Sequence, residues 1–502
     1  MDLFTALQNF TFTENGALTL ASSGSRVLDL FGQGGAYRKR STEDVVRAVT
    51  DAFTEDPLRT VETLLYLRDI RGGQGEKRVF QLGIKTIKAV VAKLGTENAL
   101  FDAIVEVGSW KDIFKIFDFD EWKNYFVQKY RDHKKAEINA GKEIPDLMFK
   151  WVPSIGGSQN KTAEKLAKYL DMTPKQYRKM LTKERAKIKL VETQMCANEW
   201  NKVDYEHIPS RAGFLYRKAF TKHDQERYSA YISAANRKDG SVKMNTGTLY
   251  PYEIIEKYNA TIYSNIWRKQ APKIDPQLEA FWKNLPDYGT DGKNALVVAD
   301  TSESMYGRPM DISCSLAIYF SEHNKGIFRN KYITFAGNPQ FYSFKEGEPL
   351  GNKLDFMYKH EICDNTNIQK VFDLVLKAAT TNHIPEEEMP EALYIISDME
   401  FDNAQGYASW RYEPTPKTNF EEIKRKYSAA GYKMPKLIFW NVDSRHDNSP
   451  VTMNEDGVAL VSGSSPSTFE MAISGDLNPY RFMLQTIEKD RYANFAKAIL
   501  KV

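Results

Sequence analysis

The amino-acid sequence predicts an α + α/β protein, with a helical domain over residues 1–285 and a doubly wound α/β domain over residues 286–502. Up to about residue 285, apolar residues recur at the spacing of amphipathic helices. From about residue 290, short apolar strands alternate with helical runs. The length of 502 residues also exceeds what one ordinary hydrophobic core accommodates, so two or more domains are expected.

The first domain begins with clear helix signals. Ser41 precedes an acidic first turn, and Pro57 opens the next apolar run, through residue 67. Further helices are expected over residues 76–94, 97–107, 113–132, 161–170, 174–181 and 184–199. Helices of this length, joined by short turns marked by Gly or Pro, favour a HEAT-like helical-repeat array, although no strict sequence period is present.

The second domain alternates strands and helices. Strands are expected at 295–300, 332–337, 341–345, 391–398, 436–442 and 458–462, and helices at 309–323, 367–382, 420–430, 466–474 and 479–489. The short segment 337–340 predicts a hairpin, whereas the other strands need helical crossovers and should be parallel. This pattern predicts one antiparallel edge strand and a ligand site at the carboxyl ends of the parallel strands.

Oxygen-bearing side chains follow three of these elements. The motif Asp-x-Ser-x-Ser comes directly after the first strand, Thr366 precedes a helix, and Asp398 ends a later strand. An isolated motif of this kind is more often a turn whose side chains bond their own backbone. Here the partners at the other strand ends favour a site for Mg²⁺ or another divalent cation, which prefers oxygen ligands. The candidate ligands are Asp300, Ser302, Ser304, Thr366 and Asp398.

This arrangement resembles the metal-ion-dependent adhesion site (MIDAS) of a von Willebrand factor A domain. One departure is Glu303, which occupies a position between the serines that is usually small.

Positive charge is concentrated in one segment, although the net charge is only +3. Residues 122–189 contain 17 Lys or Arg against 7 Asp or Glu, which suggests a surface for a polyanion such as RNA. The alternative is an ordinary solvated helix face. The candidate nucleic-acid-binding residues are Lys175, Arg178, Lys179, Lys183, Arg185, Lys187 and Lys189.

No residue pattern indicates an enzyme. The segment 72–77 lacks the spacing of a phosphate-binding loop and is expected to be a helix–helix turn, and the seven histidines lack metal-ligand spacing. The absence of a long apolar run or an amino-terminal signal, together with three distant cysteines expected to be buried and reduced, predicts a cytoplasmic protein without a membrane segment.

Several blocks together resemble the TROVE domain of Ro autoantigens and, more closely, a related family of unknown function. The blocks are residues 13–17, 30–37, 67–73, 108–112, 195–200, 209–224 and 250–253. The resemblance implies helical repeats that close into a ring, with an A domain bridging its ends. It also implies that basic residues bind structured RNA or RNA 3′ ends.

We therefore expect a non-enzymatic RNA-binding protein with a basic helical surface and a Mg²⁺-binding A domain. The alternative is a metal-dependent protein-interaction or assembly scaffold, in which a partner's carboxylate completes the metal coordination. A metal-dependent nuclease is a weaker third interpretation.

Overall fold

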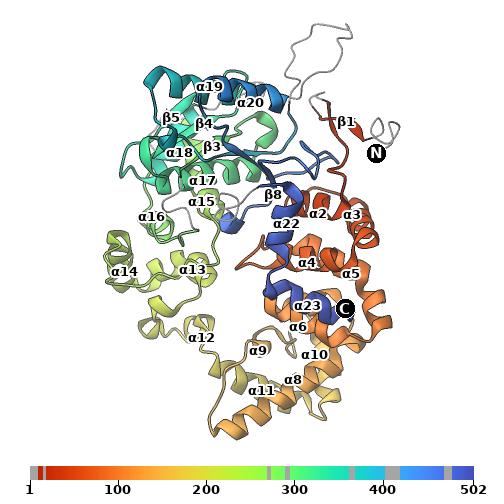
Figure 1. Cartoon of the computed structure of the whole chain (residues 1–502). Coiled ribbons are helices and arrows are strands. Elements are labelled where there is room, and N and C mark those ends of the chain that lie inside the picture. Colours follow the sequence, from red (N-terminus) through yellow and green to blue (C-terminus); the bar gives the residue numbers. More distant parts are fainter. Residues whose placement is uncertain are drawn as a thin grey trace.

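The computed structural model describes residues 9–14, 18–267, 273–288, 294–360, 368–401, 419–468 and 477–502. An amino-terminal series of helices forms an arc, and a six-stranded sheet with its own helices lies beside both ends of that arc (Figure 1). This arrangement confirms the α + α/β class. The helices of the arc are α2 (Arg26–Gly34), α3 (Thr42–Glu55), α4 (Pro57–Arg68), α5 (Lys77–Leu94), α6 (Glu97–Val107), α7 (Trp110–Ile116), α8 (Phe119–Ala140), α9 (Met148–Trp151), α10 (Asn160–Tyr169), α11 (Pro174–Lys187), α12 (Val191–Cys196), α13 (Ser210–His223), α14 (Gln225–Arg237), α15 (Pro251–Trp267) and α16 (Pro276–Lys283).

Local chemistry sets the ends of these helices. The Ser41 hydroxyl caps α3 by accepting a hydrogen bond from the Asp44 amide, and the Asp56 side chain caps α4 directly before Pro57. Helix α5 ends at Gly95, whose φ of 64° is a left-handed conformation that glycine adopts without steric cost.

Two of the expected helix boundaries are wrong. The run 113–132 is divided, because Asp118 and Glu121 form a capping box that starts α8 after α7 has ended. Conversely, α11 continues past the expected break at residues 182–183. Leu181 and Glu184 stay on the buried face, and Lys189 ends the run with a φ of 51°.

The strands of the sheet run in the expected directions. Its strands are β3 (Ala295–Ala299), β4 (Lys331–Thr334), β5 (Phe341–Ser343), β6 (Ala392–Ser397), β7 (Lys436–Asn441) and β8 (Val458–Ser462). Their order is β5-β4-β3-β6-β7-β8, with only the β4–β5 pair antiparallel in the described sheet. The hairpin and the antiparallel edge strand are therefore confirmed.

Helices of the second half include two that the sequence did not indicate. α17 (Arg308–His323), α19 (Ile368–Asn382), α20 (Asn419–Ala429) and α22 (Pro479–Ile487) were expected, whereas α18 (Leu350–Lys359) and α23 (Asp490–Leu500) were not. A short 3-10 turn occupies Pro466–Thr468, and the rest of the helix expected at 466–474 lies outside the described residues. A two-stranded ribbon of β1 (Phe10–Phe12) and β2 (Leu18–Leu20) precedes α2.

The end of the chain returns to the helical arc. Helix α23 packs on α4 and α6, and its Arg491 and Tyr492 both contact the buried Asp69 carboxylate. Arg491 Nε lies 2.5 Å from Asp69 Oδ2, and the Tyr492 hydroxyl lies 3.1 Å from the same oxygen. The carboxyl-terminal helices are therefore part of the helical body, although they follow the sheet in sequence.

Both ends of the arc contact the sheet region. Helix α2 packs on β8, and α15 packs on α17 (Figure 1). The Gly35 amide donates to Ser462 Oγ at 3.0 Å, and the Gln33 side chain donates to the Asn448 carbonyl at 2.7 Å. A Cβ at position 35 would lie 2.7 Å from the Ser462 carbonyl oxygen, so this close approach requires glycine.

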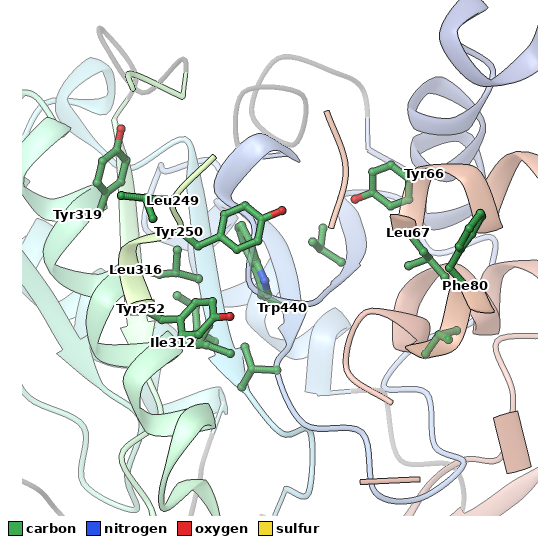
Figure 2. Packing of buried hydrophobic residues seen from close by; sticks show 14 of the residues in the cluster. Tyr66, Leu67, Phe80, Leu249, Tyr250, Tyr252, Ile312, Leu316, Tyr319 and Trp440 are labelled. Carbon is green, nitrogen blue, oxygen red and sulfur yellow. The ribbon is translucent and has the colours of Figure 1, made fainter. Parts of the chain in front are cut away.

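One continuous hydrophobic core joins the two halves. Figure 2 shows Tyr250 and Tyr252, which precede and begin α15, near Ile312 of α17, with Trp440 of β7 in the same buried cluster. The Tyr250 hydroxyl also donates to the Ile70 carbonyl at 3.4 Å, across 180 residues of sequence. The loop after α4 therefore meets the segment that enters α15.

A buried carboxyl group lies where α15 packs on α17. Asp311 is 6% exposed and accepts a hydrogen bond from the Asn259 side chain. Burial, together with the negative charge of Glu256, raises the pKa of Asp311 to about 7. The stability of the fold should therefore depend on whether the Asp311 carboxyl group is protonated.

None of the described helices combines the length and apolar character that a bilayer crossing needs. Of the cysteines, Cys314 is buried, whereas Cys196 is exposed, contrary to expectation, and Cys363 lies outside the described residues.

Candidate functional site

Two buried acids meet at the carboxyl edge of the sheet. Asp300 follows β3 and Asp398 follows β6, and these strands are parallel neighbours. The Asp300 amide donates to the Ile396 carbonyl at 3.1 Å, and Ser397 Oγ donates to Asp300 Oδ2 at 2.6 Å. The two aspartates are 1% and 2% exposed, so both carboxylates are removed from bulk water.

The two serines of the motif lie next to Asp300. The Ser302 amide donates to Asp300 Oδ1 at 3.0 Å, and the hydroxyl oxygens of Ser302 and Ser304 are 3.1 Å apart. Glu303 between them is exposed. The structure therefore gathers Asp300, Ser302 and Ser304 in one turn beside the strand that carries Asp398. Thr366, the fifth candidate ligand, lies outside the described residues.

The electrostatics of this edge suit a cation. Burial and the negative charge of Asp398 together raise the pKa of Asp300 to about 6, against hydrogen bonds from Ser397 and Ser302 that lower it. Two desolvated carboxylates that repel each other, with hydroxyl oxygens close by, form a donor set that fits a hard divalent ion. The described residues are therefore compatible with the expected cation.

Arg445 is a residue of this edge that sequence reasoning missed. It follows β7, and its Nη2 donates to Asp398 Oδ2 at 2.6 Å while its Nη1 lies 2.8 Å from Glu14 Oε2. The Glu14 amide in turn donates to Glu400 Oε2 at 2.6 Å. A positive charge and a segment from the amino terminus thus adjoin the candidate metal ligands.

Glu14, Glu400 and His446 form a second group of possible metal ligands nearby. However, the buried Glu400 carboxylate already accepts hydrogen bonds from Asn448 and from the Glu14 amide, and His446 Nδ1 lies 3.2 Å from its Oε1. These contacts account for the group without an ion.

A third group of possible metal ligands, His133, Glu137 and Glu184, lies between α8 and α11. Two ammonium groups neutralise it. Lys187 Nζ lies 2.6 Å from an oxygen of each glutamate, and Lys134 also pairs with both. The hydrogen bonds from these lysines hold the pKa of Glu137 and of Glu184 below the ordinary value despite burial. A metal ion would have to displace a buried ammonium, so this group is an ion-pair cluster that ties the two helices together.

The candidate RNA-binding residues on and after α11 divide into two sets. Lys187 belongs to the ion-pair cluster with a side chain that is 4% exposed, and the Arg185 guanidinium donates to the carbonyls of Phe149 and Val152. These two side chains point towards α8 and α9 and make contacts inside the protein, so they are not available to a ligand in this conformation. The remaining five are exposed: Lys175, Arg178, Lys179, Lys183 and Lys189.

A second group of cations gathers from separate helices. It comprises Arg68 at the end of α4, Lys77 at the start of α5, Lys111 of α7 and Arg211 of α13. Partial burial lowers the pKa of Lys77, and the charges of Arg68, Arg211 and Lys111 lower it further, against the opposing charge of Asp112. We call these four residues the central cationic cluster.

Only part of this charge is neutralised. Arg68 pairs with Asp112 at 2.7 Å, and Arg211 pairs with Glu253. In the described part of the chain, neither Lys77 nor Lys111 has a carboxylate within ion-pair distance. The Lys111 ammonium instead lies 5.4 Å from the ring centre of Trp151, which is 38% exposed. An aromatic face therefore accompanies the unpaired positive charge.

The glycine-rich segment 72–77 is a helix–helix turn, as expected. Its amides are used inside the protein, because those of Gly73 and Gly75 donate to the Asp69 carbonyl and that of Gln74 to the Tyr66 carbonyl. A phosphate would have to displace these backbone hydrogen bonds.

Comparisons with known proteins place the chain in a family of unknown function. Residues 13–143 and 141–288 match the family described as "Domain of unknown function (DUF2828)", and these ranges cover more than half of the chain. The chain belongs to the DUF2828 family. Residues 294–490 match "Domain of unknown function (DUF7788)". The chain is also 28% identical, over 525 aligned residues, to an uncharacterized protein of Acanthamoeba polyphaga mimivirus, and the alignment covers 96% of this chain and 88% of the viral protein.

In this DUF2828 protein, some site residues carried a sequence signal and others did not. Arg445 follows a strand that is parallel to the strand before Asp300, so the parallel topology could have predicted that both residues lie at the same edge of the sheet. Lys77, Lys111 and Arg211 are distributed over more than 130 residues, and only the curvature of the helical arc brings them together.

Proposed function

We propose that this protein is a non-enzymatic, cytoplasmic RNA-binding protein related to the TROVE/Ro proteins. Its HEAT-like helical arc would carry the RNA surface, and its carboxyl-terminal sheet would be a von Willebrand factor A-like domain with a divalent-cation site. The central cationic cluster is the observation that carries the proposal.

The cluster supports a polyanionic ligand for an energetic reason. Like charges held close together raise the free energy of the unliganded protein, and they add to the effect of burial in lowering the pKa of Lys77. A phosphate backbone would relieve this repulsion and release counterions. Trp151 beside Lys111 and Lys150 adds a surface on which an unpaired base can stack.

The five exposed cations on and after α11 form a second candidate contact with RNA. Lys175, Lys179 and Lys183 recur every four residues, so they project from one face of the helix. The opposite face is buried through Tyr177 and Leu181. A long RNA could contact this stripe in addition to the central cationic cluster.

RNA binding is tested by fluorescence anisotropy with a labelled single-stranded RNA and a duplex of the same length. We expect binding that weakens steeply between about 50 and 200 mM salt, because phosphate contacts dominate. No binding of either RNA at the lower salt concentration would refute the proposal. Cleavage of the RNA with Mg²⁺ or Mn²⁺, lost in Asp300→Ala, would instead favour the metal-dependent nuclease.

The cation site would use Asp300, Ser302, Ser304 and Asp398, with Thr366 as a further candidate. A bound Mg²⁺ would neutralise the two buried carboxylates and offer an open coordination position to an external oxygen. This gathering of ligands also favours the second candidate function, a metal-dependent interaction or assembly scaffold. Capture of a carboxylate-bearing protein that is abolished both by EDTA and by Asp300→Ala, in a protein that binds no RNA, would establish that alternative.

A further inference from the structure

The Arg445 guanidinium connects the candidate metal site to the amino-terminal segment. It bridges two carboxylates, with 2.6 Å from Nη2 to Asp398 Oδ2 and 2.8 Å from Nη1 to Glu14 Oε2. The Asp398 side chain is 2% exposed and that of Glu14 is 49% exposed. Arg445 therefore holds one buried carboxylate, which belongs to the metal site, and one accessible carboxylate, which does not.

The contacts of Asp398 leave little room for a metal while Arg445 stays in place. Its Oδ2 accepts from Arg445, and its Oδ1 accepts from the Glu400 amide at 3.1 Å. Arginine does not lose its proton in proteins, so its charge opposes a nearby cation at every working pH. A divalent ion that uses Asp398 must therefore compete with the guanidinium.

Part of the hydrogen-bonding capacity of Arg445 is unused in the described structure. Its Nε is buried and has no hydrogen-bond acceptor among the described residues. Buried donors are normally satisfied, so the unused Nε leaves the Arg445 guanidinium with one hydrogen bond fewer than it can make. The guanidinium has a second anchor in Glu14, towards which it can shift when it leaves Asp398.

The amino-terminal segment holds that second anchor in place. The Glu14 amide donates to the buried Glu400 carboxylate at 2.6 Å, and Thr13 Oγ1 donates to the Phe401 carbonyl at 2.7 Å. Glu400 and Phe401 directly follow Asp398 and Met399 in the chain. Glu14 is therefore fixed to the same loop that carries the candidate metal ligand.

We propose that the Arg445 guanidinium competes with the divalent cation for the Asp398 carboxylate. When the cation binds, the guanidinium leaves Asp398 and pairs with Glu14 alone. This inference rests on the proposed cation site. The competition lowers cation affinity in the free protein and couples occupancy of the site to the amino-terminal segment.

The test measures Mn²⁺ affinity by isothermal titration calorimetry for the full chain, Arg445→Gln, Glu14→Gln and a control, Arg329→Gln. Arg329 lies just before the start of β4 and pairs with the exposed Glu346. The start of β4 is at the edge of the sheet opposite to the carboxyl ends that carry the site, so Arg329→Gln removes the same charge far from the site. We expect Arg445→Gln to bind Mn²⁺ about tenfold more tightly, since removing one positive charge about 6 Å from a divalent ion has this effect even with water-like screening. The control should bind like the wild type.

Glu14→Gln should have the opposite effect and bind Mn²⁺ more weakly. The substitution removes the carboxylate with which the displaced Arg445 would pair, and it leaves the hydrogen bond from the amide of residue 14 to Glu400 intact. Because the Glu14 side chain is half exposed, this variant tests the inference even if Arg445→Gln does not fold.

The outcomes separate the inference from the proposal beneath it. If the wild type and Arg445→Gln both fail to bind Mn²⁺, the cation site is absent and both ideas fall. If the wild type binds and Arg445→Gln binds equally or less tightly, Arg445 merely positions Asp398, and only the inference is overturned. Unchanged or tighter binding by Glu14→Gln would likewise remove Glu14 from the mechanism.

Discussion

Neutralising the two unpaired lysines of the central cationic cluster is the most direct perturbation of the proposed RNA surface. Lys77→Gln and Lys111→Gln together remove two positive charges that have no ion-pair partner among the described residues. Both side chains are exposed, so the double variant should fold normally. Any change in RNA affinity can then be attributed to lost contacts with phosphate.

The size of the effect follows from counterion release. For single-stranded nucleic acid, each neutralised phosphate contributes about 0.7 to the slope of log affinity against log salt. Two lost contacts should lower the magnitude of the slope by about 1.4. Between about 50 and 200 mM salt, the wild-type advantage over the double variant should therefore shrink about sevenfold.

The assay is fluorescence anisotropy with one single-stranded RNA across a series of salt concentrations. The control is Lys88→Gln with Lys202→Gln, which removes the same charge from lysines already paired with Glu121 and Glu199. If the double variant and the control have equal slopes of log affinity against log salt, the central cationic cluster does not contact phosphate. An equal loss of affinity at all salt concentrations would also refute the reasoning, since it would mean a non-electrostatic effect.

Three further predictions concern stacking, pH and the closure of the chain. Trp151→Ala should weaken binding of single-stranded RNA by about 1–3 kcal/mol without changing the salt slope, as measured in the same anisotropy series. Burial raises the pKa of Asp311 to about 7, so the folded state favours the protonated carboxyl group. The contribution of Asp311 to the free energy of unfolding is therefore complete below about pH 4 and is lost as the pH rises to about 7. Asp311→Asn should therefore be more stable than the wild type at pH 8, by up to about 4 kcal/mol in urea unfolding, and this gain should vanish near pH 4; a gain that persists at pH 4 would contradict the titration. Asp69→Ala should lower the free energy of unfolding by about 2–4 kcal/mol, because it leaves the buried Tyr492 hydroxyl without its acceptor and breaks the pair with Arg491. Glu106→Ala, which removes the exposed partner of Arg491, should cost less than about 1 kcal/mol, and equal losses in the two variants would show that burial is not the cause.

Local sequence pattern was sufficient for much of the sheet and its edge. Continuous apolar runs such as 295–299 are long enough for a buried strand and too short for a helix, so the strands and their mostly parallel direction could be inferred. Since parallel strands end at one edge, the proximity of Asp300 and Asp398 also followed from topology. The boundaries of helices α7, α8 and α11 were less accurate, because capping and packing compete with simple periodicity.

The direction in which long side chains point could not be inferred. Lys187 and Lys183 lie on the same helix and look equivalent in sequence, yet one is enclosed between Glu137 and Glu184 and the other is exposed. The difference depends on which neighbouring helix supplies carboxylates. Arg185 is likewise drawn inward by carbonyl groups from a separate segment.

The sequence by itself determined the two-part architecture, the parallel direction of most strands and the acidic loop, because each depends on residues that are close together in the chain or share one regular element. Tertiary structure alone decided that Glu14 meets Arg445, that α23 packs on α4, and that Arg211 lies close enough to Lys77 to lower its pKa. These interactions join segments separated by more than a hundred residues, and they depend on how distant elements pack together, which no local pattern records.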